Sequence, residues 1–202
     1  MKEMLTAVQR VIDAETAALQ VLQSVPTEQY AEVVQTLADC KGKVVFMGVG
    51  KSAHIGKKLA ATFASTGTPA FFVHSTEAVH GDFGMIEERD VVILISNSGN
   101  TGEVVQDLPS LRKIGCKTIA MTSGTESALA KGCDLCLFFP KLPEADAFNL
   151  APTVSTTMTL ALGDAIAIAL SEHKKFSKEQ FHIFHPGGAL GKRLLDESKE
   201  EK

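Results

Sequence analysis

The 202-residue chain has no excess of positive charge and no long uninterrupted apolar run. Its 20 lysines and arginines are outnumbered by 24 aspartates and glutamates, so the net charge of −4 gives no support for nucleic-acid or anionic-membrane binding. The apolar runs are far shorter than the roughly 20 residues that span a bilayer. The amino end, MKEMLTAVQRVIDAE, carries acids where a signal peptide needs a continuous apolar core. We therefore expect a cytoplasmic protein with no nucleic-acid or membrane partner.

Cysteine is also scarce, with four residues in the chain. Cys133 and Cys136 form a single CxxC pair, while Cys40 and Cys116 stand alone. A zinc site would need a second pair or histidines at ligand spacing, and the sequence has neither. The CxxC runs into an apolar, strand-like stretch instead of opening a helix, which favours reduced structural cysteines over a redox motif. We expect no metal and no organic cofactor.

What the chain does contain is an alternation of short β-like runs and helical stretches. Apolar residues at helical spacing predict amphipathic helices over 3–23 and 28–40. Five strands are predicted at Val44–Met47, Ala70–Val73, Val91–Ser96, Thr118–Thr122 and Leu135–Phe139, with further helices near 52–65, 102–114, 126–131 and 154–172. This alternation predicts an α/β fold, a doubly wound five-stranded parallel sheet flanked by helices. We expect one domain over 1–202, with amino-terminal helices in 1–40, the sheet in 43–140, and a helix and tail in 141–202.

The stretch VVFMGVGKSAHIG, residues 45–57, has the outline of a phosphate-binding loop between a strand and a helix. A Walker A loop would place its first glycine at position 45, where the chain has Val45, so a nucleotide triphosphatase is disfavoured. A dinucleotide fingerprint would need an acid at the end of the next strand, where the chain has His74. Neither of these two nucleotide motifs is complete.

The same stretch keeps the features that glycine loops share. Gly48 and Gly50 let backbone N–H groups approach an anion at a helix start, and Ser52 adds a hydroxyl donor. Lys51 adds a positive charge. The alternative is a tight strand-to-helix turn that binds nothing.

A second polar loop follows the third predicted strand in the sequence ISNSGNTGE. Four of its side chains can donate hydrogen bonds to a phosphate monoester, and these are Ser96, Asn97, Ser98 and Thr101. An N-capping loop would explain one such residue but not this density. Because the carboxyl ends of parallel strands share one edge of the sheet, the two loops converge there. A phosphorylated small molecule is therefore the leading ligand.

With these two loops in place, the sequence resembles the SIS (sugar isomerase) domain, and within that superfamily the arabinose 5-phosphate isomerase family. The resemblance is carried by GVGKSAHIGKKLAATFASTGTPAFFVH, EAVHGDFGMI, VVILISNSGNTGE, LAPTVSTTMTLALGDAIAIAL and FHPGGALGKRLL, which together reach from about residue 44 to 195. Val49 and Ala53 replace the methionine and last glycine of the family's usual glycine loop. Typical members continue into two CBS domains, whereas this sequence ends in DESKEEK, so the resemblance is to a form without them.

The resemblance implies an aldose–ketose isomerase that interconverts ribulose 5-phosphate and arabinose 5-phosphate through an enediol. The family's charged site residues carry over onto Lys51, Glu103, Glu144 and His185. Lys51 would hold the phosphate or an enediolate oxygen, Glu103 would orient Lys51 or the sugar, Glu144 would transfer the proton, and His185 would assist ring opening. Alternatives stay open: Glu103 as a first-turn helix acid, Glu144 as a solvated loop carboxylate, and Asp146 as the base.

Gly50, Ser52 and the second loop would bind the substrate phosphate, and His80 and Asp82 would line the site at a second level. In related domains the site histidine reaches the active site of a neighbouring subunit. The resemblance therefore implies a homo-oligomer, with a tetramer built on the amino-terminal helices favoured. The competing functions are a non-catalytic sugar-phosphate sensor, a SIS isomerase for another sugar phosphate, and a sugar-phosphate lyase or etherase.

Overall fold

The computed structural model describes residues 1–187 and contains a single five-stranded sheet. The strands are β1 Val44–Gly48, β2 Ala70–His74, β3 Val91–Ile95, β4 Lys117–Thr122 and β5 Leu135–Phe138. They are ordered β2-β1-β3-β4-β5, and every neighbouring pair is parallel. This confirms the predicted α/β class and five-stranded parallel sheet, with each strand within one residue of its expected bounds.

Both faces of the sheet are buried, which explains why its strands read as continuous apolar runs. Along β1 the side chains alternate between two separate hydrophobic cores. Val44 and Phe46 belong to one core, and Val45 and Met47 belong to the other. All four are at most 1% exposed. A strand that is apolar at every position therefore needs helices on both sides of the sheet.

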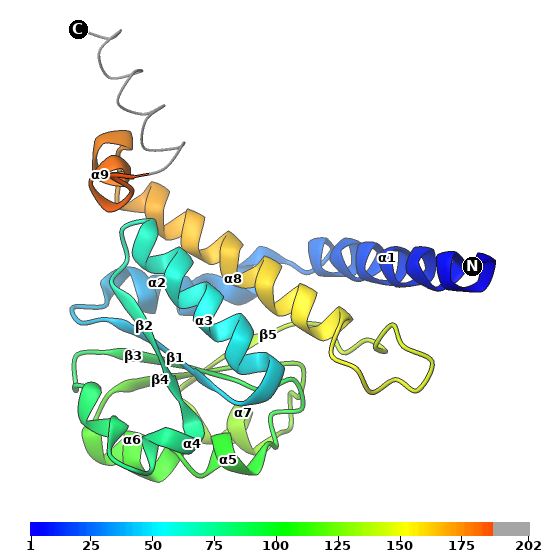
Figure 1. Cartoon of the computed structure of the whole chain (residues 1–202). Coiled ribbons are helices and arrows are strands. Elements are labelled where there is room, and N and C mark those ends of the chain that lie inside the picture. Colours follow the sequence, from blue (N-terminus) through cyan, green and yellow to red (C-terminus); the bar gives the residue numbers. More distant parts are fainter. Residues whose placement is uncertain (188–202) are drawn as a thin grey trace, which may run out of the picture.

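The helices divide between the two faces of the sheet (Figure 1). One face is covered by α1 Lys2–Gln23, η1 Thr27–Tyr30, α2 Ala31–Asp39, α3 Gly50–Ser65 and α8 Val154–His173. The other is covered by α4 Ser75–Ala78, η2 Asp82–Met85, α5 Gly102–Val105, α6 Leu108–Ile114 and α7 Ala128–Gly132. The short helix α9 Lys178–Phe184 follows α8, and α1 projects away from the body of the domain (Figure 1).

Two predicted helices are each divided in the structure. The helix expected over 28–40 begins as the 3₁₀ turn η1 before α2, and the one expected over 102–114 is broken into α5 and α6. Pro109 lies in the first turn of α6, where its missing N–H costs no intrahelical hydrogen bond. In the interior of one continuous helix over 102–114 it would cost one, so the helix is divided before it. The short elements α4, η2 and α9 were not predicted.

Helix α8 is long and apolar enough to cross a membrane by length and composition alone, with a mean hydropathy of 1.5, but half of it is buried inside the domain. It packs along α3 with a close approach at Gly163, where a Cβ would lie 2.5 Å from the Leu59 side chain. These two helices therefore form the inner layer on their face of the sheet. Because α8 and α3 run side by side, their amino ends lie near the same edge of the domain (Figure 1).

Candidate functional site

The strand order places a switch point between β1 and β3, because the chain proceeds from β1 outward in both directions. In open α/β sheets, ligands bind outside the carboxyl ends of the strands at such a point. The two loops singled out from the sequence leave the sheet there, one after Gly48 and the other after Ile95. A Cβ on Gly48 would lie 3.2 Å from the carbonyl oxygen of Ile95, so the two strand ends approach closely.

The first loop passes from β1 into α3 through Gly50, which has a φ of +58°. Val49 is the N-cap and gives no side-chain hydrogen bond to the first turn of α3. The amino end of a 16-residue helix is thus left with unbonded N–H groups and the positive end of its dipole. Ser52 is half-buried, and Lys51 is exposed with no ion pair to any residue in 1–187. This end of α3 can accept an anion.

The second loop is held in shape by its own first residue. Ser96 is buried, and its hydroxyl lies 2.8 Å from the Thr101 hydroxyl and accepts the Gly99 N–H at 3.0 Å. Gly99 has a φ of +67°, and a Cβ there would collide with the Ser127 side chain. Ser98 is exposed in the middle of this loop. The Ser96 hydroxyl therefore holds the loop in shape, while the Ser98 hydroxyl accepts the Asn100 N–H at 3.2 Å in an exposed position.

Residues from the next strand, which the sequence analysis missed, brace the second loop. The Ser123 hydroxyl lies 2.8 Å from both the carbonyl and the side-chain oxygen of Asn97. The Ala128 N–H donates to the Asn100 side-chain oxygen at 2.9 Å. Ser123 follows β4 in a sequence that reads as an ordinary turn, so its partner 26 residues earlier could not be inferred without the sheet order.

Glu144 caps the amino end of α8. Its carboxylate accepts the Thr153 N–H at 2.8 Å, the Thr153 hydroxyl at 3.1 Å, the Ser155 N–H at 3.3 Å and a short hydrogen bond from the Ser155 hydroxyl. Partial burial acts to raise the pKa of Glu144, but the hydrogen bonds from Ser155 and Thr153 outweigh it and lower the pKa below its usual value. Glu144 is thus a fixed, ionised carboxylate at neutral pH.

A cavity of about 210 Å³ joins these parts. Its walls are formed by Ser52, Ile55, Asn97, Glu144, Asn149, Leu150, Pro152, Ser155, Thr156 and Thr159. Three residues named from the sequence meet here: Ser52 from the first loop, Asn97 from the second, and Glu144. The cavity therefore combines hydroxyl and amide donors with one carboxylate. Among residues 1–187 there is no group of three metal-ligating side chains.

The other predicted site residues lie outside the cavity lining, including Gly50, Ser96, Ser98 and Thr101 of the two loops. Lys51 adjoins Ser52, and Glu103 lies exposed in the first turn of α5, just beyond the second loop. His80 and Asp82 are exposed in the segment that follows β2, at the same edge of the sheet.

His185 lies at the opposite end of the domain. Lys174 donates to the Thr68 hydroxyl at 2.8 Å, which fixes the start of the tail beside the carboxyl end of α3. The cavity lies at the other end of that helix, about 24 Å away at 1.5 Å per residue (Figure 1). The His185 ring stacks on Phe181 with centroids 4.0 Å apart. The rest of the predicted HPGGALG segment, from residue 188, lies outside the described residues.

Comparison with known proteins agrees with this fold and loop arrangement. The family model for the SIS domain matches residues 36–169. The chain belongs to the SIS domain family. As a SIS domain, it has a solved neighbour of 50% identity, the Escherichia coli CFT073 protein c3406 in complex with arabinose 5-phosphate, with a TM-score of 0.89 over 92% of this chain and 98% of that one.

Two curated relatives carry more specific names. The SIS chain is 47% identical over 193 residues to the arabinose 5-phosphate isomerase KpsF of Escherichia coli, covering 95% of its own length and 59% of the relative's. It is 51% identical over 187 residues to the arabinose 5-phosphate isomerase KdsD of Pseudomonas aeruginosa, covering 93% and 57%. The chain thus spans less than two thirds of the length of either relative.

Proposed function

We propose that the chain is an aldose–ketose isomerase that interconverts arabinose 5-phosphate and ribulose 5-phosphate in the cytoplasm. The observation that carries the proposal is the cavity in which Ser52, Asn97 and Glu144 meet at the β1/β3 switch point. Its lining brings donor side chains from two loops together with one carboxylate, a combination that suits a sugar phosphate. The names of the curated relatives and of the solved neighbour support the same substrate.

The reaction moves hydrogen between two adjacent carbons of an open-chain sugar phosphate. A base removes the proton from C2 of the aldose while the carbonyl oxygen at C1 takes up a proton, which gives the enediol. The enediol then loses the proton on the C2 oxygen and gains one at C1, which gives the ketose. Glu144 is the proposed base, since it is the ionised carboxylate in the cavity lining, and a positioned base contributes about 10²–10⁴-fold to the rate.

The phosphate is proposed to bind across the two loops, with Gly50, Ser52, Asn97, Ser98 and Thr101 as donors and Ser96 as the brace of the second loop. Lys51 and Glu103 flank this site from the starts of α3 and α5. Lys51 is proposed to balance the phosphate or enediolate charge, because its ammonium group is exposed beside Ser52. Glu103 is proposed to orient Lys51 or a sugar hydroxyl.

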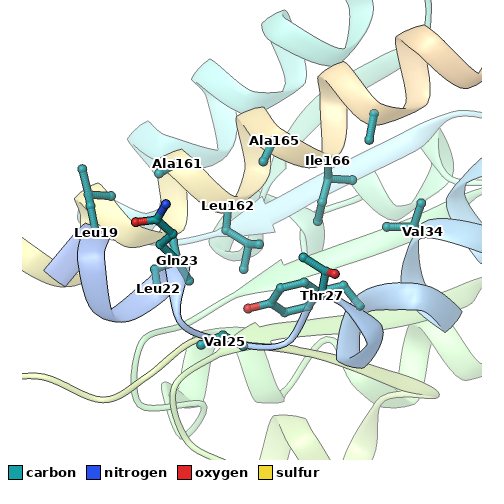
Figure 2. A pocket seen from close by; sticks show the side chains of 12 residues that line it. Leu19, Leu22, Gln23, Val25, Thr27, Val34, Ala161, Leu162, Ala165 and Ile166 are labelled. Carbon is teal, nitrogen blue, oxygen red and sulfur yellow. The ribbon is translucent and has the colours of Figure 1, made fainter.

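A second copy of the chain is part of the proposal. An apolar groove of about 500 Å³ lies between the end of α1 and α8, and Figure 2 shows Leu19 and Leu22 facing Ala161, Ala165 and Ile166 across it. The amino half of α1 carries exposed apolar side chains, which are Met4, Leu5, Val8 and Ile12. A helix with an uncovered apolar stripe next to an apolar groove is suited to pairing with an identical helix and groove. A homotetramer is the favoured assembly.

The oligomer would also explain the position of His185, which is too far from the cavity of its own chain to act there. A neighbouring copy is proposed to bring its His185 to the site for ring opening. Light scattering coupled to size exclusion tests the assembly, with Val8→Asp as the variant that should shift the mass towards monomer. A monomeric wild type would contradict this part of the proposal.

A discontinuous assay of arabinose 5-phosphate against ribulose 5-phosphate, with EDTA present, tests the function. Ribose 5-phosphate, glucose 6-phosphate and fructose 6-phosphate are run in parallel. Turnover confined to the arabinose pair supports the proposal. No turnover, together with a thermal shift on one sugar phosphate, would instead support a sensor. Turnover of another pair would identify a SIS isomerase of different specificity.

A further inference from the structure

The loop between β5 and α8 forms one wall of the cavity and is held by its own side chains. The Asp146 carboxylate accepts the N–H groups of Phe148 at 3.0 Å and of Leu150 and Ala151 at 2.8 Å each. Desolvation acts to raise the pKa of Asp146, but the hydrogen bonds from the Ala151, Leu150 and Phe148 N–H groups together outweigh it and lower the pKa below its usual value. Because three backbone donors converge on one carboxylate, and the Asn149 N–H donates to the Asp146 carbonyl at 3.2 Å, the residues of this turn have a defined position.

Asn149 lies within this braced turn and has a φ of +57°. Asparagine and glycine tolerate this left-handed conformation better than other residues. Its side-chain oxygen accepts the backbone N–H of Glu144 at 2.6 Å. Since that N–H must face an acceptor, the orientation of the amide is fixed, with Oδ1 towards Glu144. The Nδ2 group makes no hydrogen bond with any residue in 1–187 and keeps two N–H donors.

Asn149 lines the same cavity as Ser52, Asn97 and Glu144. Asn149 is itself exposed, and its side chain is tied to the backbone of Glu144, the residue proposed as the base. A neutral amide donor suits a neutral hydroxyl or carbonyl oxygen, whereas the dianionic phosphate is matched by the helix ends. Asn149 could not be singled out from the sequence, because an asparagine in FNLAPT resembles an ordinary loop residue.

We propose that Asn149 contacts the substrate, donating a hydrogen bond from Nδ2 to a hydroxyl or carbonyl oxygen of the sugar while its Oδ1 fixes the backbone at Glu144. The inference rests on the proposed isomerase function and names one of its specificity-determining residues. A donor at this place distinguishes a sugar phosphate from inorganic phosphate, which has no oxygen at that end of the cavity.

Asn149→Gly tests the contact, because glycine adopts the same backbone conformation and removes the amide. Lys175→Gly is the matched control. Lys175 has a similar φ of +53° but follows the carboxyl end of α8, away from the cavity. The expected result for Asn149→Gly is a KM for arabinose 5-phosphate raised about five- to tenfold, the loss of one hydrogen bond, with a smaller change in kcat. The inhibition constant of inorganic phosphate should stay within error of wild type, and stability should fall by no more than about 1.5 kcal/mol, the usual cost of losing one hydrogen bond, here that from the Glu144 N–H to Oδ1.

Asn149→Asp sharpens the test, since it keeps an acceptor for the Glu144 N–H and replaces the donor with an anionic oxygen. It should raise KM more than the glycine variant does. An unchanged KM in an active Asn149→Gly enzyme would overturn the inference and leave the proposed function intact. A parallel loss of phosphate inhibition and a larger fall in stability would also overturn it, since the role would be structural. Absence of turnover in the wild type would overturn the proposed function and this inference together.

Discussion

The Glu144 carboxylate accepts the Thr153 backbone N–H at 2.8 Å, so the proposed base is also the cap of the helix that follows it. The two roles, base and helix cap, can be tested separately, because one affects kcat and the other affects stability. The cap fixes the carboxylate in the cavity, and the same hydrogen bonds make it a weaker base.

Glu144→Gln should reduce kcat by about 10²–10⁴-fold, because the amide cannot take a proton. It should also lower the free energy of unfolding by about 1 kcal/mol through loss of the charge at the amino end of α8. Steady-state kinetics and thermal unfolding measure the two effects. Inhibition by inorganic phosphate should persist, which shows that the site is still formed. Near-normal turnover would remove Glu144 from the base role and leave it as a cap.

Asp107 should make the protein less stable as the pH rises. Asp107 and Ser75 are both fully buried, and among the described residues neither side chain has a partner within normal hydrogen-bond geometry, although the two groups are close enough to interact. Burial raises the pKa of Asp107 to about 6, while the Ser75 hydroxyl acts in the other direction. The native state therefore holds a proton that the unfolded chain has released, and stability should fall as the pH rises from about 4 to about 6.

Asp107→Leu replaces the carboxyl group with an apolar side chain of the same branching. The decrease of stability with rising pH should then become smaller. At pH 8 the substitution should stabilise the protein by up to about 3 kcal/mol, since one pKa unit corresponds to about 1.4 kcal/mol. Denaturant titrations at pH 5 and pH 8 provide the measurement. A wild-type stability that rises between these two pH values, with the variant behaving alike, would show that Asp107 is not the responsible group.

Ser96 and Ser98 should respond differently to the same substitution. Ser96→Ala removes the hydroxyl that accepts the Gly99 N–H at 3.0 Å and contacts the Thr101 hydroxyl at 2.8 Å. The Ser96 carbonyl still accepts the Gly99 N–H at 3.1 Å, so a loss of about 0.5–1.5 kcal/mol of stability is expected. Ser98→Ala at an exposed position should change stability by less than about 0.5 kcal/mol and raise KM instead. Unfolding curves and KM for arabinose 5-phosphate give the comparison. An unchanged KM for Ser98→Ala would count against phosphate at this loop.

A site completed by a second subunit predicts complementation between inactive variants. His185→Ala and Glu144→Gln should each be inactive alone, and their co-expressed mixture should regain up to about a quarter of wild-type activity in shared sites. The assay compares the mixture with each variant and with wild type at equal concentration. If the mixture stays inactive while forming mixed oligomers, His185 does not act on the neighbouring site.

The sequence was most informative where one physical cause dominates. The strands were predictable because burial on both faces makes every position apolar, as in Val44–Gly48. The position of the two polar loops was predictable because each follows a strand, and parallel strands end at the same edge of the sheet. The break before α6 could have been read from Pro109.

Other features depend on partners that are distant in the chain. Ser155 gave no sign of bonding Glu144, because a serine after LAPTV reads as part of a helix start. The hydrogen bond from Ser123 to Asn97 could be predicted only once β3 and β4 were known to be neighbours. The burial of Asp107 was equally hidden, since an aspartate before a proline-containing helical turn resembles a solvent-exposed cap. In each case the sequence shows the residue type but not the distant residue that contacts it in the fold.

The parallel packing of α3 and α8 has an electrostatic consequence for the cavity between their amino ends. Two long helix dipoles direct positive potential towards it. Glu144 neutralises this potential at α8 and leaves that at α3 uncompensated. The electrostatic potential in the cavity is therefore uneven, since it attracts anions near Ser52 and repels them near the Glu144 carboxylate. A molecule with one charged and one neutral end would enter it in a single direction.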